Sequence, residues 1–346
     1  MKYPVEQIRN FCEQVWEKAG LSHEDAVSCT DALLAADLRG QRTHGTTHMK
    51  DYCDRILNGT VSTGSDIDIR QTSPAALVVD ARHAVGMVAG AKAMARCIEQ
   101  AKISGACFAS IHNSSHYGLG AYYPMMALKE NMIGFSFSNT PALVAPFGGA
   151  DPLLGTNPIS IAIPAGKHPP LVLDIATSVV AKGRIALAMK EGSTIPEGWA
   201  LDKNGAPTTD PAAANEGVLL PFGHHKGYAL ELVGSLLSFG LSGASMDTQI
   251  PRFFEQKEMT ANFGHFMGCI NISTFCDIND FKARVDAMFD ILKACRPAVG
   301  SMGVMIPGEI EYNMTAKTMA EGIDLSEPTL HDFREMATIF GVEYTF

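Results

Sequence analysis

Two histidines four residues apart are the first residues in the chain whose types and spacing could do chemistry. His44 and His48 lie in the segment THGTTHMKDY, and on a helix their imidazoles would share one face. Such a pair could hold a metal ion, although the acidic residue of the zinc pattern H-E-x-x-H is absent. The pair could also be structural, or His44 could give and take a proton near neutral pH. The local sequence leaves all three interpretations open.

A polar cluster and two charged residues add to the candidate chemistry. His112 and His116 bracket three polar residues in the segment HNSSHYGLG, after a buried strand, which is typical of a site but also of a surface turn. Lys226 begins an apolar helix, where it could bind a phosphate or simply be solvated. Asp174 ends the strand LVLDI, where it could accept hydrogen bonds from ribose hydroxyls or cap a following helix.

The glycines of the chain do not form the usual dinucleotide fingerprint. No G-x-G-x-x-G follows a strand and opens a helix, and the pair Gly118 and Gly120 lacks the third glycine. The segment PFGGADPLLGTNP, in contrast, combines three glycines with three prolines, which indicates a fixed, turning backbone that holds something. A nucleotide site in this chain would therefore not be of the Rossmann type.

The composition limits the classes of function. The 346 residues are 46% hydrophobic and 18% charged, with a net charge of -10, which argues against general binding to nucleic acid or to an anionic membrane. So few charges favour a large subunit contact, and we expect a homo-oligomer. The eight cysteines are scattered without a C-x-x-C pair, and the first residues lack the apolar core of a signal peptide. We therefore expect a cytoplasmic protein with reduced thiols and no membrane span.

The hydrophobic periodicity places these residues on alternating helices and strands, without the even rhythm of a doubly wound sheet. Ser22 caps an expected helix that Gly40 ends. Further helices are predicted over 46–57, 86–104, 226–241 and 281–295, and strands over 75–80, 106–111, 133–138, 159–163, 171–175 and 265–272, before a terminal helix and strand.

Taken together, the motifs resemble a known family along nearly the whole chain. They are THG with Tyr52, NSSHYG (113–118), PFGGADPLLGTNP (146–158), LDIATS (173–178), IPEGWALDKNGAPTTDP (195–211), HKGYAL (225–230) and IPGEIE (306–311). In this order they are similar to the malate/L-lactate dehydrogenase family of the second, non-Rossmann type. That family includes ureidoglycolate, diketogulonate, sulfolactate and cyclic-imine-acid oxidoreductases.

The resemblance implies an NAD(P)-dependent oxidoreductase of 2-hydroxy acids and 2-oxo acids. The implied fold class is α/β (α+β), with a mostly antiparallel, non-Rossmann nucleotide-binding sheet and a helical substrate lobe. It divides the chain into an N-terminal helical region (1–70), a substrate and dimer lobe (71–120 with 300–346) and an NAD(P)-binding domain (121–299). The active site would lie near the interface of a homodimer. The hydride chemistry would belong to the cofactor, and the protein would supply position and a titratable acid.

The resemblance also implies roles for single residues. His44 matches the proton donor and acceptor, and His116 a second histidine beside the nicotinamide. The substrate would contact Thr43, His48 and Tyr52. The expected cofactor contacts are Thr140, Asn157, Asp174, Ile175, Ala176, His225, Lys226, Pro307, Gly308 and Glu309. No metal ion is expected.

Three positions depart from the family pattern. Thr43 replaces a commoner serine, and His224 stands where many members have glycine. His48 occupies the place of an arginine that grips the substrate carboxylate in many members, and an imidazole lacks the two-pronged guanidinium. Carboxylate binding should therefore be weaker, pH-dependent or shared with another group. A cyclic imine acid reductase, a metal-dependent hydrolase that uses His44 and His48, and a silent binder of a small acid stay as alternatives.

Overall fold

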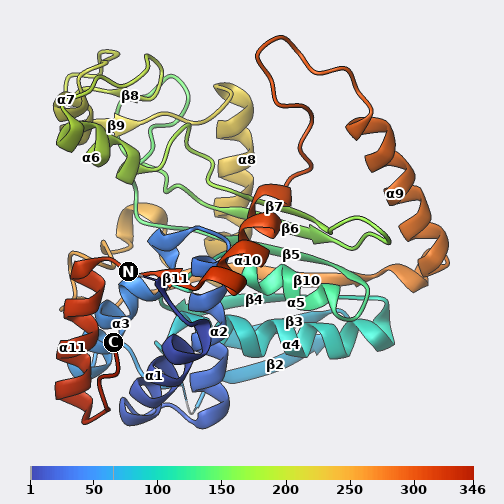
Figure 1. Cartoon of the computed structure of the whole chain (residues 1–346), viewed down its shortest axis with the longest axis horizontal. Helices are drawn as coiled ribbons and strands as arrows, with labels where there is room; N and C mark the ends of the chain where they lie inside the picture. Colours follow the sequence, from blue (N-terminus) through green and yellow to red (C-terminus); the bar gives the residue numbers. More distant parts are fainter. Residues whose placement is uncertain (1, 65) are drawn as a thin grey trace.

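The computed structural model describes residues 2–64 and 66–346, and its centre is one seven-stranded sheet (Figure 1). The strands are β2 (Asp68–Ser73), β3 (Ala76–Asp80), β4 (Ala106–Ser114), β5 (Met132–Ser138), β6 (Ile159–Ile163), β7 (Leu171–Ile175) and β10 (Phe263–Asn271). Their order is β2-β3-β4-β10-β5-β6-β7, and every neighbouring pair is antiparallel except β3 with β4. This mostly antiparallel sheet confirms the predicted α/β (α+β), non-Rossmann fold class.

Helices cover both faces of the sheet. Successive side chains of each strand point to opposite faces, and both sets pack against helices. Helices α4 (Gly86–Ser104) and α5 (Tyr122–Leu128) pack on one face, where a Cβ on Gly134 of β5 would meet the backbone of Pro124. Phe137, three residues further along β5, points to the other face, where it approaches Gly234 of helix α8 (His225–Ser235). Helix α8 continues as a π turn (Leu236–Gly240). Figure 1 shows α8 on the opposite side of the sheet from α4 and α5.

Both ends of the chain join in a helical lobe beside the sheet (Figure 1). Helices α1 (Val5–Lys18), α2 (His23–Leu38), α3 (Met49–Leu57) and α11 (Glu327–Phe340) share one apolar core, and β1 (Lys2–Tyr3) pairs with β11 (Ile323–Asp324). Ser22 caps α2 by accepting the backbone N–H of Asp25, as predicted. The core of this lobe fixes α3, which carries Tyr52.

A smaller lobe lies above the helical lobe, at the upper left of Figure 1. Helix α6 (Lys182–Glu191), β8 (Ala200–Leu201), α7 (Pro211–Glu216) and β9 (Val218–Leu219) enclose their own apolar core. Helix α9 (Ile278–Lys293) extends away from the sheet, and α10 (Glu309–Glu321) returns towards α2. No helix in the described ranges has the length and apolar character needed to cross a membrane.

Several predicted elements have different bounds. Strand β4 continues to Ser114, three residues beyond the expected end, because β10 pairs with it as far as Phe263. The expected helix over 46–57 is a 3₁₀ turn (Thr46–His48) followed by α3, with another 3₁₀ turn (Arg42–His44) before Gly45. Asp174 caps no helix, and the chain ends with helix α11 rather than with a strand. The division at residues 70, 120 and 299 stays a prediction.

Candidate active site

A cavity of about 520 Å³ lies where the helical lobe, the sheet and the smaller lobe meet. Its walls come from the 3₁₀ segment before α3, the loops after β4 and β5, the end of β7, the start of α6 and the segment 252–255. The cavity is lined by seven of the predicted site residues, Thr43, His44, His116, Thr140, Asp174, Ile175 and Ala176. Residues far apart in the sequence therefore share one concave site, which is typical of a small-molecule pocket.

A tight backbone turn places His44 in the cavity wall. Gly45 follows it, and a Cβ there would lie 1.9 Å from the carboxylate of buried Asp37, which accepts the N–H (2.9 Å) and the hydroxyl (2.7 Å) of Thr46. The Thr43 hydroxyl lies 3.1 Å from His44 Nδ1, which leaves Nε2 for another group. Burial, together with the nearby His48, lowers the pKa of His44 to about 4. The imidazole is therefore neutral at pH 7 and able to accept a proton.

His116 is held in one orientation by two donors. Tyr52 Oη lies 2.6 Å from Nδ1, and the backbone N–H of Gly118 donates to the same nitrogen at 3.3 Å. Because a backbone N–H can only donate, Nδ1 accepts, and the imidazole proton is on Nε2. Burial, followed by the neighbouring His44, lowers the pKa of His116 well below its ordinary value. His116 is thus a neutral, oriented hydrogen-bond donor.

Aromatic rings surround this donor. The centroid of the His116 ring lies 5.5 Å from that of Phe253, 5.0 Å from Phe254 and 6.3 Å from Phe263. The rings of His44 and His116 are stacked with centroids 6.0 Å apart and an interplanar angle of 22°. The apolar surroundings keep water from competing with the two imidazoles and so strengthen their hydrogen bonds to a ligand.

Buried Asp247 fixes the loop that carries Thr140 and Thr156. Its Oδ2 accepts the N–H of Gly155 at 2.9 Å and the side-chain N–H of Asn157 at 2.7 Å. Asn157 Oδ1 in turn accepts the N–H of Thr140 at 2.9 Å, and the Thr140 hydroxyl accepts the N–H of Thr156 at 2.8 Å. A Cβ on Gly155 would lie 2.2 Å from that hydroxyl, so the glycine is required. The segment predicted to hold something is therefore itself rigid.

A hydroxyl and a glycine set the position of Asp174 at the end of β7. The Ser160 hydroxyl donates to Asp174 Oδ1 at 2.5 Å, and a Cβ on Gly120 would lie only 2.5 Å from Ser160 Oγ. Burial raises the pKa of the Asp174 carboxyl, and the bond from Ser160 opposes that change. A half-buried carboxylate at the end of a strand, beside exposed Ile175 and Ala176, fits the hydroxyl groups of a nucleotide ribose.

Comparison with known proteins identifies the chain. The profile of the malate/L-lactate dehydrogenase family matches residues 3–334. The chain belongs to that family. Its malate/(S)-sulfolactate dehydrogenase relative from Methanothermus fervidus is 36% identical over 341 residues, which cover 99% of this chain and 98% of the relative. The chain is thus a dehydrogenase of the malate/sulfolactate group, an oxidoreductase that acts on hydroxy acids.

Two further relatives of this malate/L-lactate dehydrogenase family member cover nearly its full length. The (2R)-3-sulfolactate dehydrogenase (NADP(+)) of Chromohalobacter salexigens is 33% identical over 93% of each chain. The solved structure of sulfolactate dehydrogenase from Methanocaldococcus jannaschii superimposes with a TM-score of 0.94 at 36% identity, over 99% of this chain and 98% of that one. The fold described above is therefore that of the family.

The remaining predicted residues of this family member lie outside the cavity lining. Tyr52 contacts His116, Asn157 accepts the N–H of Thr140, and His48 contacts Phe254. His225 begins α8 beside Phe147, with Lys226 next to it. The turn Pro307, Gly308 and Glu309 lies at the other edge of β7, where the Pro307 carbonyl accepts the N–H of Val172. These last five residues do not line the cavity.

Some cavity residues of this dehydrogenase carried no signal in the sequence. Lys182 and the segment 252–255 line the cavity, yet they belong to no motif that the periodicity or spacing singled out. His265, a single histidine within a strand, also carried no signal; it does not line the cavity but stacks on Tyr117, which does. It lies 2.9 Å from the hydroxyls of both Ser138 and Ser114, and burial lowers its pKa to about 3. In residues 2–64 and 66–346, no group of three or more His, Cys, Asp or Glu side chains could hold a metal ion.

Proposed function

We propose that the protein transfers a hydride between NAD or NADP and carbon 2 of a 2-oxo or 2-hydroxy acid, with His44 as proton donor and acceptor. The observation that carries this proposal is the stacking of His44 and His116 in a cavity also lined by Thr140 and Asp174. When bound, the nicotinamide supplies or takes the hydride. The protein then has to position the acid, exclude water and move one proton.

His44 has the surroundings that this proton transfer needs. In oxidation, the hydroxyl of the acid loses its proton to Nε2 of His44 while carbon 2 loses a hydride. In reduction, His44 returns that proton to the carbonyl oxygen. The low pKa of His44 favours the neutral base, and the Thr43 hydroxyl can accept a hydrogen bond from Nδ1–H, which leaves Nε2 to take the proton.

His116 supports the same reaction without giving up its proton. Its Nε2–H is a donor for the oxygen on carbon 2, and the bonds from Tyr52 and Gly118 keep the ring from turning. A fixed donor that binds the developing alkoxide stabilises the transition state without reorganisation. His116 is proposed as a catalytic residue, and Tyr52 as a positioning residue.

The proposed cofactor contacts divide into two groups. Thr140, Asp174, Ile175 and Ala176 lie in the cavity wall and have free polar or apolar surface for a ribose and a nicotinamide ring. His225, Lys226 and the turn at 307–309 are further proposed contacts outside this wall. They fit the proposal that a homodimer completes the active site.

Exposed apolar side chains support the homodimer. Leu230, Val233 and Leu236 on α8 and its π turn are about half exposed, and Ile291 on α9 is 73% exposed. Apolar surface of this extent on two helices is typical of a subunit contact. Light scattering of the purified protein tests the dimer, and a monomer at micromolar concentration would contradict it.

All eight cysteines are free thiols, which supports a cytoplasmic location.

The activity test follows the absorbance of NADH and NADPH, in parallel, with pyruvate, oxaloacetate, aromatic 2-oxo acids and a cyclic imine acid. We expect turnover of at least one 2-oxo acid with one of the two cofactors. Turnover of the cyclic imine alone would establish the imine reductase alternative instead. If neither cofactor binds by calorimetry, the proposed function is wrong.

A further inference from the structure

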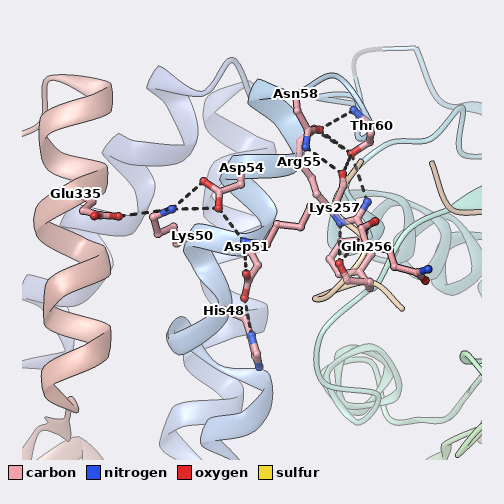
Figure 2. Close-up of polar contacts among 11 residues, drawn as sticks. His48, Lys50, Asp51, Asp54, Arg55, Asn58, Thr60, Gln256, Lys257 and Glu335 are labelled. Carbon is pink, nitrogen blue, oxygen red and sulfur yellow. Dashed lines mark hydrogen bonds and ion pairs between the residues drawn. The ribbon is translucent and has the colours of Figure 1, made fainter. Parts of the chain in front are cut away.

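The His48 imidazole is engaged by other side chains and not by the cavity. Its ring stacks on Phe254 with centroids 4.0 Å apart, and its Nδ1 lies 2.9 Å from Asp51 Oδ2. Asp51 is also paired with Lys257 at 2.6 Å, as Figure 2 shows. Phe254 lines the cavity, whereas His48 does not. An acidic group in the cavity therefore needs a cation from another position.

Buried contacts hold the segment 252–259 against helix α3. The fully buried Arg55 guanidinium donates to the carbonyl oxygens of Phe253 (3.0 and 2.6 Å), Gln256 (2.9 Å) and Met259 (2.9 Å). Figure 2 shows Arg55 reaching from α3 into this segment. Because a planar guanidinium with several partners has little freedom, the backbone next to Arg252 is fixed.

Lys182 and Arg252 are the lysine and arginine side chains that line the cavity in the part of the chain that the structure describes. Both also line an adjoining cavity of about 280 Å³, so they stand where the two cavities meet. Arg252 pairs with Glu255 at 3.1 Å, whereas no partner within the described residues binds the Lys182 ammonium. Burial and then the charge of Arg252 lower the pKa of Lys182, which indicates that the two cations are neighbours. Two cations beside one carboxylate leave a positive charge for an anionic ligand.

We propose that Lys182 and Arg252 together bind an acidic group of the substrate, the task that an arginine at position 48 would otherwise perform. This inference rests on the proposed function. Arg252 directly precedes Phe253, whose ring lies 5.5 Å from His116, so the backbone that carries Arg252 runs beside the histidines while both cations line the same cavity. An ammonium and a guanidinium form charge-assisted hydrogen bonds with carboxylate or sulfonate oxygens. The preferred substrates are therefore acids whose charge reaches this pair, and amides of the same acids are poor substrates.

The first test compares wild-type protein with Lys182→Met and Arg252→Met. We expect each substitution to raise the KM for the 2-oxo acid by about tenfold or more, because a hydrogen bond to a charged group is lost. The KM for NADH or NADPH and the kcat should stay the same. Lys190→Met is the matched control, because Lys190 is an exposed residue of the same helix α6 and should leave all constants unchanged.

A substitution of Glu255 should change the KM for the acid in the opposite direction. Glu255→Gln removes the carboxylate that competes for Arg252, so the KM for the acid should fall. Added salt should raise the KM of wild type more than that of the double variant Lys182→Met/Arg252→Met, because Arg252 is about half exposed and screening acts on exposed charges. A rise in the cofactor KM with an unchanged acid KM would overturn the proposal and assign the pair to the cofactor phosphates. Unchanged constants in all variants would overturn it too.

A rescue experiment tests whether Lys182 and Arg252 bind the acidic group that an arginine at position 48 would bind. His48→Arg in the Lys182→Met/Arg252→Met background should lower the KM for pyruvate or oxaloacetate again. No rescue, together with normal acid binding by the double variant, would contradict the proposal. If wild type oxidises no reduced cofactor, the proposed function fails, and calorimetric binding of oxaloacetate to wild type and to Lys182→Met then tests the anchor by itself.

Discussion

The cavity has two walls that use their polar groups in different ways. At the wall made by the 3₁₀ segment and α3, the side chains have fixed partners: Tyr52 contacts His116, and Arg55 binds three backbone carbonyls. At the wall where α6 begins, the Lys182 ammonium has no partner in residues 2–64 and 66–346, and Arg252 has one exposed partner. Fixed partners set the geometry that proton transfer needs, whereas an unpaired ammonium and a guanidinium with one exposed partner can still bind a ligand.

The largest expected effect is the loss of the proton-transferring group from the fixed wall. His44→Ala should lower kcat by at least about 100-fold, the usual contribution of a positioned general acid or base. His331→Ala is the control, because His331 is an exposed histidine on α11. Steady-state rates with the best acid of the panel measure both variants. Near wild-type turnover of His44→Ala would remove His44 from the mechanism.

The next effect concerns the stability of the same wall. Arg55→Met leaves the carbonyls of Phe253, Gln256 and Met259 buried without their donor, and we expect the free energy of unfolding to fall by about 3 kcal/mol. Urea unfolding followed by circular dichroism measures the change. Arg70→Met, at an exposed site on β2, should change it by less than about 0.5 kcal/mol. Equal stability of the two variants would show that the segment 252–259 does not depend on Arg55.

A pH profile tests the wall that carries His44, because this wall lowers the pKa of the proposed proton donor and acceptor. Burial holds the pKa of His44 at about 4, below its ordinary value, so the protonated form accumulates only under acid conditions. The kcat/KM for oxidation of a hydroxy acid should be level near neutral pH and fall about tenfold per pH unit below that pKa. Reduction should show the opposite trend. A bend near pH 6.5 in protein that is still folded would contradict the lowered pKa of His44.

The smallest expected effect is the loss of one orienting bond. Tyr52→Phe keeps the ring but removes the donor to His116 Nδ1, and we expect kcat to fall about fivefold, as for the loss of about 1 kcal/mol. Tyr312→Phe, on exposed α10, is the control. Because a positioning residue acts on turnover and not on acid binding, the KM of Tyr52→Phe should not change. A rise in KM with constant kcat would instead place Tyr52 in contact with the substrate.

The sequence predicted most of the strands and one part of the site. Alternating burial in β5 and the cap at Ser22 follow from local patterns, and the structure bears them out. The motif residues His44, His116 and Asp174 meet in one cavity. The bounds of β4 and α3 were wrong, because strand pairing with β10 and the buried Asp37 beside Gly45 override local propensity.

The sequence by itself determined the family, because the motifs that carry it are contiguous in the chain, and the resemblance to that family implied the fold class. The tertiary structure alone decided which side chains share the cavity and which charged groups line it. Lys182 and Arg252 are 70 positions apart, and neither belongs to a motif, yet both line the same two cavities. Their meeting, and the engagement of His48 by Phe254 and Asp51, depend on long-range packing that no local pattern encodes.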